Sequence, residues 1–213
     1  MRTTVKVTTP PDGEPTTVKL VKLHCRIDSN ADDDLLTGYL TTARTVAEDY
    51  LSRALLTQTI LWTVRPSSLL HTEQSRLCGT LELPRAPVQS IESVVTLDEW
   101  GNATTISPAP LPLVPPAAIL GYVADLALEP ATLLIGRETV LSGGYPLHAT
   151  RLQHVQVAMV VGYDSVADVP MTTIQAVMMI TAFLYEHRGD TGETMPEAAM
   201  RLLDRTRLQF LGG

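Results

Sequence analysis

The stretch LPRAPVQSIESVVTLDEWGN, Leu83–Asn102, has the most specific pattern in the chain, and it predicts β structure. Its prolines Pro84 and Pro87 push the residues before them toward extended geometry and remove two backbone donors. The run Val88–Leu97 is rich in β-branched residues, and Gly101 follows it in a turn-like setting. The stretch contains no nucleophile–base pair, no ligand cluster and no phosphate-binding loop, so we expect its role to be architectural.

Other strand patterns surround this stretch and predict an inserted antiparallel β region over about residues 57–162. The clearest is Val155–Val161, where Val155, Val157, Met159 and Val161 recur at every second position up to Gly162. A second indicates a hairpin with Glu129-Pro130 at its tip. Residues 107–121 are rich in proline and are expected to form an exposed loop. The remaining expected strands are residues 3–8, 59–64, 79–83, 91–97, 104–106, 122–128 and 132–135.

Helical patterns precede the β region. A short helix capped by Thr16 or Thr17 is predicted to end at about Cys25. A longer helix is expected to begin after Ser29 and to end at about Leu55, because its apolar residues recur at helical spacing. Three aspartates, 32–34, fall in its first turn, where the helix dipole favours anions.

Two further helices are predicted after the β region. Residues 171–187 are apolar on nearly every side, which is typical of a helix covered on two sides. In a chain of this size, the second cover could be another subunit. A final helix is expected from Pro196 to about Phe210, with Glu197 and Arg201 as an i,i+4 ion pair.

These patterns together predict an α+β fold. It consists of a long-helix bundle, formed by the N-terminal and C-terminal helices, with an inserted antiparallel β region. We expect one domain over residues 1–213. Its helical spine is expected over about 16–56 and 171–210, and a C-terminal docking tail over about 206–213.

The composition excludes several classes of protein. The chain has a formal net charge of −7, and residues 54–170 contain ten acidic and five basic groups, which is unfavourable for binding nucleic acid tightly. Cys25 and Cys78 are too few for a disulfide framework and are expected to be reduced and buried. No apolar run is long enough to predict a membrane helix, and the N-terminus lacks the apolar region of a secretory signal.

None of the polar clusters predicts catalysis or metal binding. Adjacent aspartates on a helix do not face one another, and the histidines lack partners at zinc-ligand spacing. Glu186 and His187 end a helix and have no visible acid–base partner. The pair Gly143-Gly144 lacks the G-x-G-x-x-G spacing of a dinucleotide-binding loop. We therefore expect no enzymatic activity, no cofactor and no metal at the sites considered, which are Asp32–Asp34, His24-Cys25, His148, His154 and Gly143-Gly144.

Five groups of residues, taken in order and spacing, resemble the head–tail connector (adaptor) family of tailed phages. The resemblance covers about residues 14–190, although the region from Pro108 to Leu152 is longer than is usual in the family. The groups are Glu14-Pro15 with Leu23–Asp28; Asp34–Leu36, Ala43-Arg44, Glu48 and Arg53–Leu55; Leu83–Ile91; Val157–Asp164; and Val169-Pro170, Ile174, Ala176 and Tyr185–Arg188.

This resemblance implies a structural virion protein rather than an enzyme. It implies a ring of subunits, a dodecamer in the virion, between the portal protein and a downstream neck or tail protein. DNA would pass through the lumen without sequence-specific binding, and no membrane or cofactor is involved. The protein would reside at the head–tail interface, and in the host cytoplasm during assembly.

Two sets of residues are predicted to form contacts in such a ring. The C-terminal helix and tail form an apolar and basic segment suited to docking on the portal, although the same segment could simply pack on its own subunit. The portal-docking residues are Arg201, Arg205, Arg207, Leu208, Phe210 and Leu211, and the ring-interface residues are Arg44, Glu48, Arg53, Met179 and Phe183.

Two other classes of protein are compatible with parts of the pattern. One is a different neck protein, a stopper or tail-terminator, which would be dominated by β structure. The other is a small-molecule-binding or enzymatic α+β domain, which would need polar groups that converge in a pocket.

Overall fold

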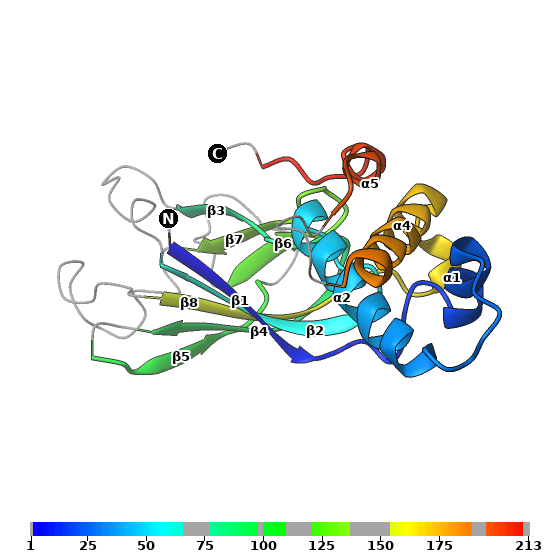
Figure 1. The fold of residues 1–213 in the computed structure, drawn as a ribbon. Helices are drawn as coiled ribbons and strands as arrows, with labels where there is room; N and C mark the ends of the chain where they lie inside the picture. Colours follow the sequence, from blue (N-terminus) through cyan, green and yellow to red (C-terminus); the bar gives the residue numbers. More distant parts are fainter. Residues whose placement is uncertain are drawn as a thin grey trace. The chain divides into compact units, whose positions relative to one another are not determined.

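The computed structural model describes residues 2–65, 77–97, 100–109, 121–136, 154–188 and 195–210, and it confirms an α+β fold (Figure 1). The chain forms two compact units. The β unit consists of Met1–Pro10 and Gln58–Val161, and the helical unit consists of Pro11–Thr57 and Gly162–Gly213.

The larger sheet of the β unit has five antiparallel strands in the order β1-β2-β8-β4-β5. At its centre, Trp62 on β2 pairs with Val157 on β8, which pairs with Val94 on β4. All three side chains are buried. The strands are β1 (Arg2–Thr9), β2 (Gln58–Arg65), β4 (Val88–Leu97), β5 (Ala103–Ile106) and β8 (His154–Val161).

The predicted alternation is seen in the burial pattern of β8, which pairs with β2 on one side and β4 on the other. Val155, Val157, Met159 and Val161 are buried, and the residues between them are only partly so. A strand with one buried face has a strongly specified register, because a shift by one residue would expose every apolar side chain. β5 returns from the Gly101 turn and pairs with β4, as predicted, and Gly101 has a φ of +83° that favours glycine.

The second sheet of the β unit has three antiparallel strands in the order β3-β7-β6. β6 and β7 form the predicted hairpin, but β6 ends at Asp125 rather than at Leu128, because only its first four residues pair with β7. The strands are β3 (Leu77–Glu82), β6 (Tyr122–Asp125) and β7 (Thr132–Gly136). Residues 110–120 of the proline-rich segment, Gly143-Gly144 and His148 lie outside the described residues.

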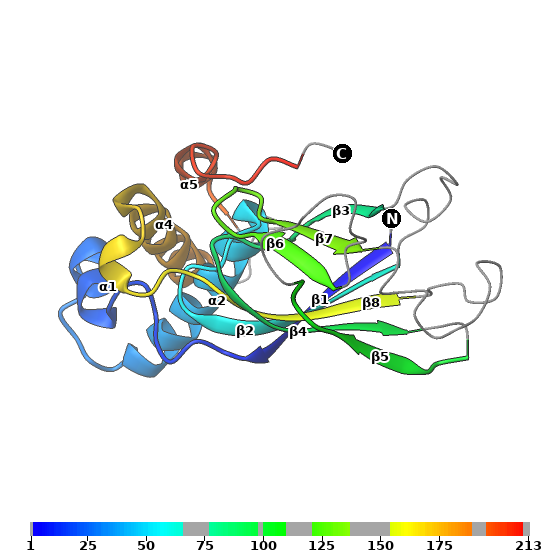
Figure 2. The same ribbon diagram turned by 180° about the vertical axis from the view of Figure 1, so that it is seen from behind.

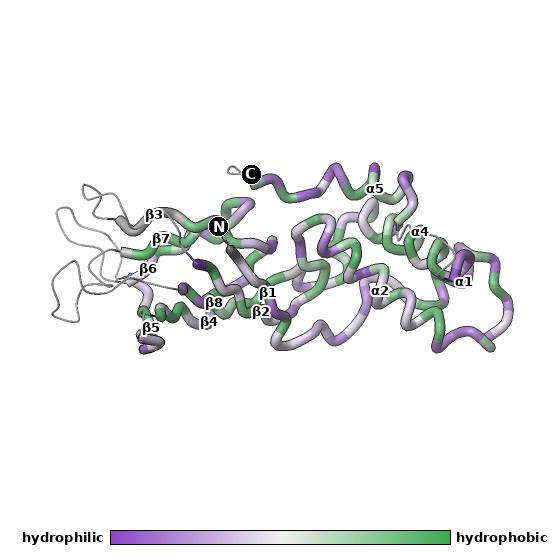
Figure 3. The backbone as a smooth tube through the Cα atoms, turned by 60° about the vertical axis from the view of Figure 1, so that its left-hand side comes forward, coloured by the Kyte–Doolittle hydropathy of each residue, from purple (hydrophilic) through white to green (hydrophobic). Residues whose placement is uncertain are grey.

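The helical unit packs four α-helices around one apolar core. Figure 3 shows the middle of α4 in the hydrophobic colour, and this part contributes Ala176, Val177 and Ile180 to the core with no exposed surface. Leu36, Leu40 and Leu51 from α2 are equally buried. The elements are α1 (Val18–Cys25), α2 (Asp33–Leu51), the short 3-10 helix η1 (Val166–Asp168), α4 (Met171–His187) and α5 (Glu197–Leu203).

The beginnings of the helices agree with the sequence patterns better than their ends. Thr17 caps α1, because its hydroxyl oxygen accepts a hydrogen bond from the amide of Leu20. The prediction that the long helix extends to Leu55 is wrong, because Ser52 adopts a left-handed conformation and ends α2. The final helix also ends early, at Leu203 rather than Phe210, so 204–210 are not part of a helical spine.

Candidate assembly surfaces

Three charged side chains form a buried network in the helical unit. Arg44 on α2 donates from Nε to Oε2 of Glu14 at 2.9 Å and from Nη1 to Oε2 of Glu48 at 3.0 Å. The other oxygen of Glu48 accepts from the amide of Leu55 at 2.8 Å. Arg44 and Glu48 are only 8% and 6% exposed. The network therefore joins the segment before α1, the middle of α2 and the chain that follows α2.

This network places two of the predicted ring-interface residues inside their own subunit. Glu48 and Arg44 are one helical turn apart, and both acceptor oxygens of Glu48 have partners. Glu14 was not among the predicted contact residues, although it belongs to the sequence pattern that carries the family resemblance. Its Oε1 accepts from the hydroxyl of Thr41 at 2.8 Å.

Arg53, the third predicted interface residue on this part of the chain, holds the C-terminal segment. Its Nε donates to the carbonyl oxygen of Thr206 at 2.6 Å. The amide of Leu208 donates to the carbonyl oxygen of Leu51 at 2.9 Å, and the Leu208 side chain is 6% exposed. The segment from Asp204 to Leu208 thus lies against the end of α2.

Tyr50 on α2 strengthens the same attachment. Its hydroxyl donates to Oδ1 of Asp204, and the guanidinium of Arg207 lies 4.7 Å from the centre of its ring. The hydrogen bond to Asp204 raises the pKa of the Tyr50 phenol, because it stabilises the neutral form. Sequence patterns give no sign of this contact, because Tyr50 and Asp204 are 154 residues apart.

The predicted portal-docking residues divide into attached and exposed members. Leu208 is buried, and Arg207 stacks on the ring described above. Arg201 is exposed and forms the predicted ion pair with Glu197. Arg205 is exposed, as is Phe210, with 39% of its surface accessible. Leu211 lies outside the described residues.

The two interface residues predicted on α4 lie at the margin of the helical core. Met179 is partly buried and packs against the core. Phe183 is half-buried and stacks on His187, with 4.2 Å between the ring centres and 30° between the planes. His187 Nδ1 is 2.9 Å from the carbonyl oxygen of Phe183. The Phe183–His187 contacts lie within α4, and both Met179 and Phe183 keep part of their side chains accessible.

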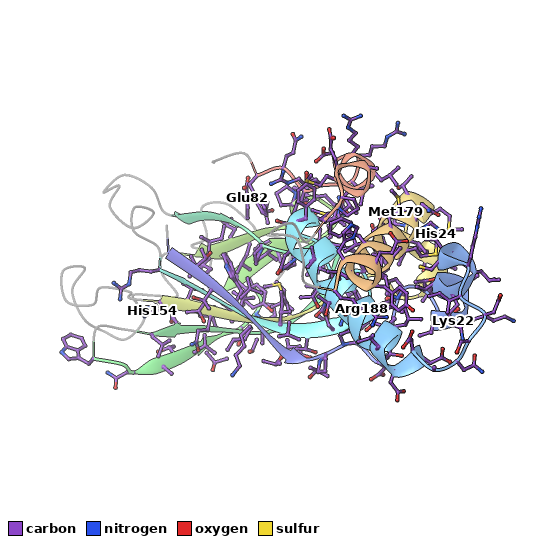
Figure 4. The ribbon with its side chains drawn as sticks, in the orientation of Figure 1. Lys22, His24, Glu82, His154, Met179 and Arg188 are labelled. Carbon is purple, nitrogen blue, oxygen red and sulfur yellow. The ribbon has the colours of Figure 1, made fainter. Side chains whose placement is uncertain are left out.

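The beginning of α2 uses its carboxylates to join three helices. Asp32 accepts from the hydroxyl of Tyr185 on α4 at 2.6 Å, and Asp33 pairs with Lys22 on α1 at 2.8 Å. Arg188, at the end of α4, is 3.8 Å from Asp32. Figure 4 labels Arg188 and Lys22, the two cations of this group. The hydrogen bond to Asp32 raises the pKa of the Tyr185 phenol. Among the described residues, no three His, Cys, Asp or Glu side chains are grouped to hold a metal ion.

Cys25 at the end of α1 is only partly buried, in contrast to the buried thiol expected from the sequence, and it is not in a disulfide. Burial raises the pKa of its thiol, and the nearby Glu186 adds to the effect. Cys78 has no described side chain. In the part of the chain that the structure describes, none of the helices is both long and apolar enough to span a membrane.

Comparison with known proteins confirms the resemblance predicted from the sequence. Residues 15–96 match the family model of the phage gp6-like head-tail connector protein. The matched residues include Arg44, Glu48 and Arg53, together with most of the Leu83–Asn102 stretch. No curated protein matches the chain.

Solved structures with the same fold come from gene transfer agent (GTA) particles. A chain of the neck of an empty GTA particle, computed with C6 symmetry, has a TM-score of 0.64 and 22% identity, covering 99% of this chain and 98% of that one. A chain of the native GTA virion has a TM-score of 0.60 and 23% identity, and the match covers 98% of each chain. A chain of the native GTA neck, computed with C12 symmetry, has a TM-score of 0.60 and 20% identity, and the match covers 99% of this chain and 98% of that one.

Proposed function

We propose that this chain, which matches the phage gp6-like head-tail connector family over residues 15–96, is a neck subunit that forms a ring beneath the portal. The observation that carries the proposal is the agreement of two independent comparisons. The family match comes from sequence, and the fold is shared with chains from the necks of GTA particles over 99% of this chain. The ring joins the head to a downstream neck or tail protein and has no enzymatic step.

The symmetry of the related particles supports a dodecameric ring. The two GTA necks were computed with C6 and C12 symmetry, both of which are compatible with twelve copies. Four packed helices favour an adaptor over a stopper or tail-terminator, which would be dominated by β structure. The ring would assemble in the host cytoplasm and remain in the virion at the head–tail interface.

The acidic character of the chain supports a lumen through which DNA slides. A net charge of −7 repels phosphates, so DNA would pass without being held. No sequence-specific DNA contact and no membrane contact are part of the proposal. A lumen lined mainly by arginine in the assembled ring would contradict this part of it.

The direct test is to locate the chain in particles. Particles from a producing host are purified, their proteins are quantified by mass spectrometry, and the neck is imaged by electron cryomicroscopy. The expected result is about twelve copies per particle, in one ring next to the portal. Absence of the chain from the necks, or a position at the far end of the tail, would overturn the proposal.

The structure also changes how portal docking by the C-terminal segment should be tested. Deletion of residues 206–213 would remove Leu208, whose side chain is buried. A loss of head–tail joining in that variant could then come from poorer folding as well as from lost docking. Phe210→Ala changes only an exposed side chain, so its effect on the free energy of unfolding should stay within about 0.5 kcal/mol. Gln209→Ala is the matched control at the neighbouring exposed position.

If the segment docks on the portal, Phe210→Ala should reduce the yield of tailed particles while heads accumulate, and Gln209→Ala should not. Arg205→Glu should act in the same direction, because it reverses an exposed charge of the predicted docking set. Normal head–tail joining in both Phe210→Ala and Arg205→Glu would remove the docking role from this segment.

A further inference from the structure

One side of α1 combines exposed apolar residues with positive charge. Val21 points into the core with no exposed surface, whereas Leu20 is 50% and Leu23 is 68% exposed. Residues three apart lie on the same side of a helix, so the two leucines form one patch. Lys19 and Arg26 beside them are exposed, and residues 15–27 contain no acidic group. We call these four residues the basic patch.

A second exposed region has the opposite charge. Val166 in η1 is 42% exposed, and Met171 at the start of α4 is 77% exposed. Asp164 and Asp168 beside them are also exposed. No lysine or arginine occurs from Gly162 to Glu186. We call Asp164, Val166, Asp168 and Met171 the acidic patch.

The two patches belong to the same helical unit but lie on different elements, α1 for the basic patch and η1 with the start of α4 for the acidic patch. In Figure 1, α1 lies in front of the yellow segment that contains η1, and in Figure 2, seen from behind, that segment lies in front of α1. One copy of the chain can therefore present its basic patch to one neighbour and its acidic patch to another.

Single exposed apolar side chains are common on protein surfaces. Here each patch has two of them, flanked by charges of one sign, and the signs are opposite. A contact between two basic patches or two acidic patches would place like charges together, which disfavours symmetric pairing of identical surfaces. A basic patch against an acidic patch gives a head-to-tail contact, and repetition of such a contact builds a ring when the rotation between neighbouring copies closes, as the proposed ring requires.

We propose that the basic patch on α1 of one copy of this chain binds the acidic patch on η1 and α4 of the next copy. The inference rests on the proposed ring and names the surfaces that build it. Lys22 is not part of the contact, because it pairs with Asp33 inside the subunit.

The test uses charge reversal on each patch in full-length chains expressed in the particle-producing host. Lys19→Glu cancels the net positive charge of the basic patch and leaves the acidic patch intact, whereas Asp164→Lys cancels the net negative charge of the acidic patch and leaves the basic patch intact. Each variant alone should lower the copies of the chain per particle by about tenfold. When both variants are expressed together, they can alternate around the ring, and incorporation should recover to within about threefold of the wild type.

Matched controls separate this contact from a general effect of charge. Lys6→Glu and Glu92→Lys make charge changes of the same size at exposed positions of the β unit. Both should be incorporated like the wild type. Circular dichroism and thermal unfolding of each purified variant identify any loss of folding.

Two results would overturn the inference. One is that Lys19→Glu and Asp164→Lys are incorporated as well as the controls. The other is that folded variants are each excluded and that expressing them together restores nothing, which would assign the two sites to another partner. If wild-type chains are found in the neck, either result rejects only these contact surfaces and leaves the proposed ring standing. If the wild-type chain is absent from the neck, the proposed function itself is contradicted.

Discussion

Arg53 Nε donates to the carbonyl oxygen of Thr206 at 2.6 Å, across 153 residues of sequence. With the main-chain bond from Leu208 to Leu51, this contact fastens the chain after α5 to the end of α2. The C-terminal segment is therefore part of the helical unit as far as Leu208, and the exposed Phe210 lies just beyond the attachment.

Arg53→Ala should loosen this attachment. Loss of a hydrogen bond from a charged donor costs about 1.5–3 kcal/mol. Hydrogen exchange at the amide of Leu208 should become faster, and the free energy of unfolding should fall by a similar amount. Arg205→Ala, at an exposed position of the same segment, is the control and should change neither. Unchanged exchange at Leu208 in Arg53→Ala would show that the main-chain bond suffices.

A second prediction concerns the buried network of Arg44. Arg44→Met keeps the aliphatic volume but removes the guanidinium that contacts the carboxylates of Glu14 and Glu48, which should cost about 3–5 kcal/mol. Arg44→Met/Glu48→Gln should lose less than the sum of the single variants, because the two side chains are in direct contact and Gln still offers an acceptor to Leu55. Urea unfolding measures the free energy of unfolding of Arg44→Met, Glu48→Gln and the double variant.

Thr45→Ala is the matched control for that series. Thr45 is exposed on the same helix, so its replacement should change the free energy of unfolding by less than about 0.5 kcal/mol. If Arg44→Met is as mild as Thr45→Ala, the network does not stabilise the subunit.

The sequence was most informative where local patterns decide the structure. Alternating burial along Val155–Val161 needs only one buried face, and the cap at Thr17 needs only neighbouring residues. The end of α2 was missed because no sequence pattern marks Ser52 as the residue that adopts the left-handed conformation. The end of α5 was missed because the chain after it is held by a distant group: the amide of Leu208 donates to the carbonyl oxygen of Leu51.

The candidate surfaces show the same limit. Charged residues of the family pattern were expected at interfaces, and two of them, Arg44 and Glu48, are buried partners of each other. Which charged residues are internal depends on Glu14 being brought beside α2 from 30 positions earlier in the chain. The exposed leucines of α1 are consistent with its helical spacing, but only the packing of Val21 shows which side of the helix is covered.

A third prediction follows from the Tyr185–Asp32 hydrogen bond. Because this bond raises the pKa of Tyr185, the folded state favours the neutral phenol. Its contribution to stability is complete below the ordinary tyrosine pKa of about 10, and it is lost as the pH rises through the higher value of the folded state. Stability should therefore decline at alkaline pH.

Asp32→Ala should lower the pKa of Tyr185 toward its ordinary value, as measured by NMR titration of the ring carbons. Asp32 precedes α2 but makes no capping hydrogen bond with its side chain, so this variant tests the tyrosine contact rather than the cap. Asp34→Ala, an exposed position in the same turn, is the control. An equal pKa of Tyr185 in both variants would exclude Asp32 as the cause.

A fourth prediction compares one substitution at two glycines of the helical unit. Gly162 has a φ of +110°, and a Cβ atom there would lie 2.1 Å from the carbonyl oxygen of Leu56. Gly38, within α2, has no atom within 4 Å of its Cβ position. Gly162→Ala should cost on the order of 4 kcal/mol, because the clash is with main chain and the conformation is unfavourable for alanine.

Gly38→Ala should instead raise the free energy of unfolding by about 0.5–1 kcal/mol, because alanine loses less backbone entropy in a helix than glycine does. Urea unfolding of the two variants and the wild type, in the same buffer, measures both effects. The opposite signs are the decisive feature, since the chemical change is identical. A mild effect of Gly162→Ala would mean that the main chain of Leu56 can move away without cost, and that this close approach does not constrain the chain between β8 and α4.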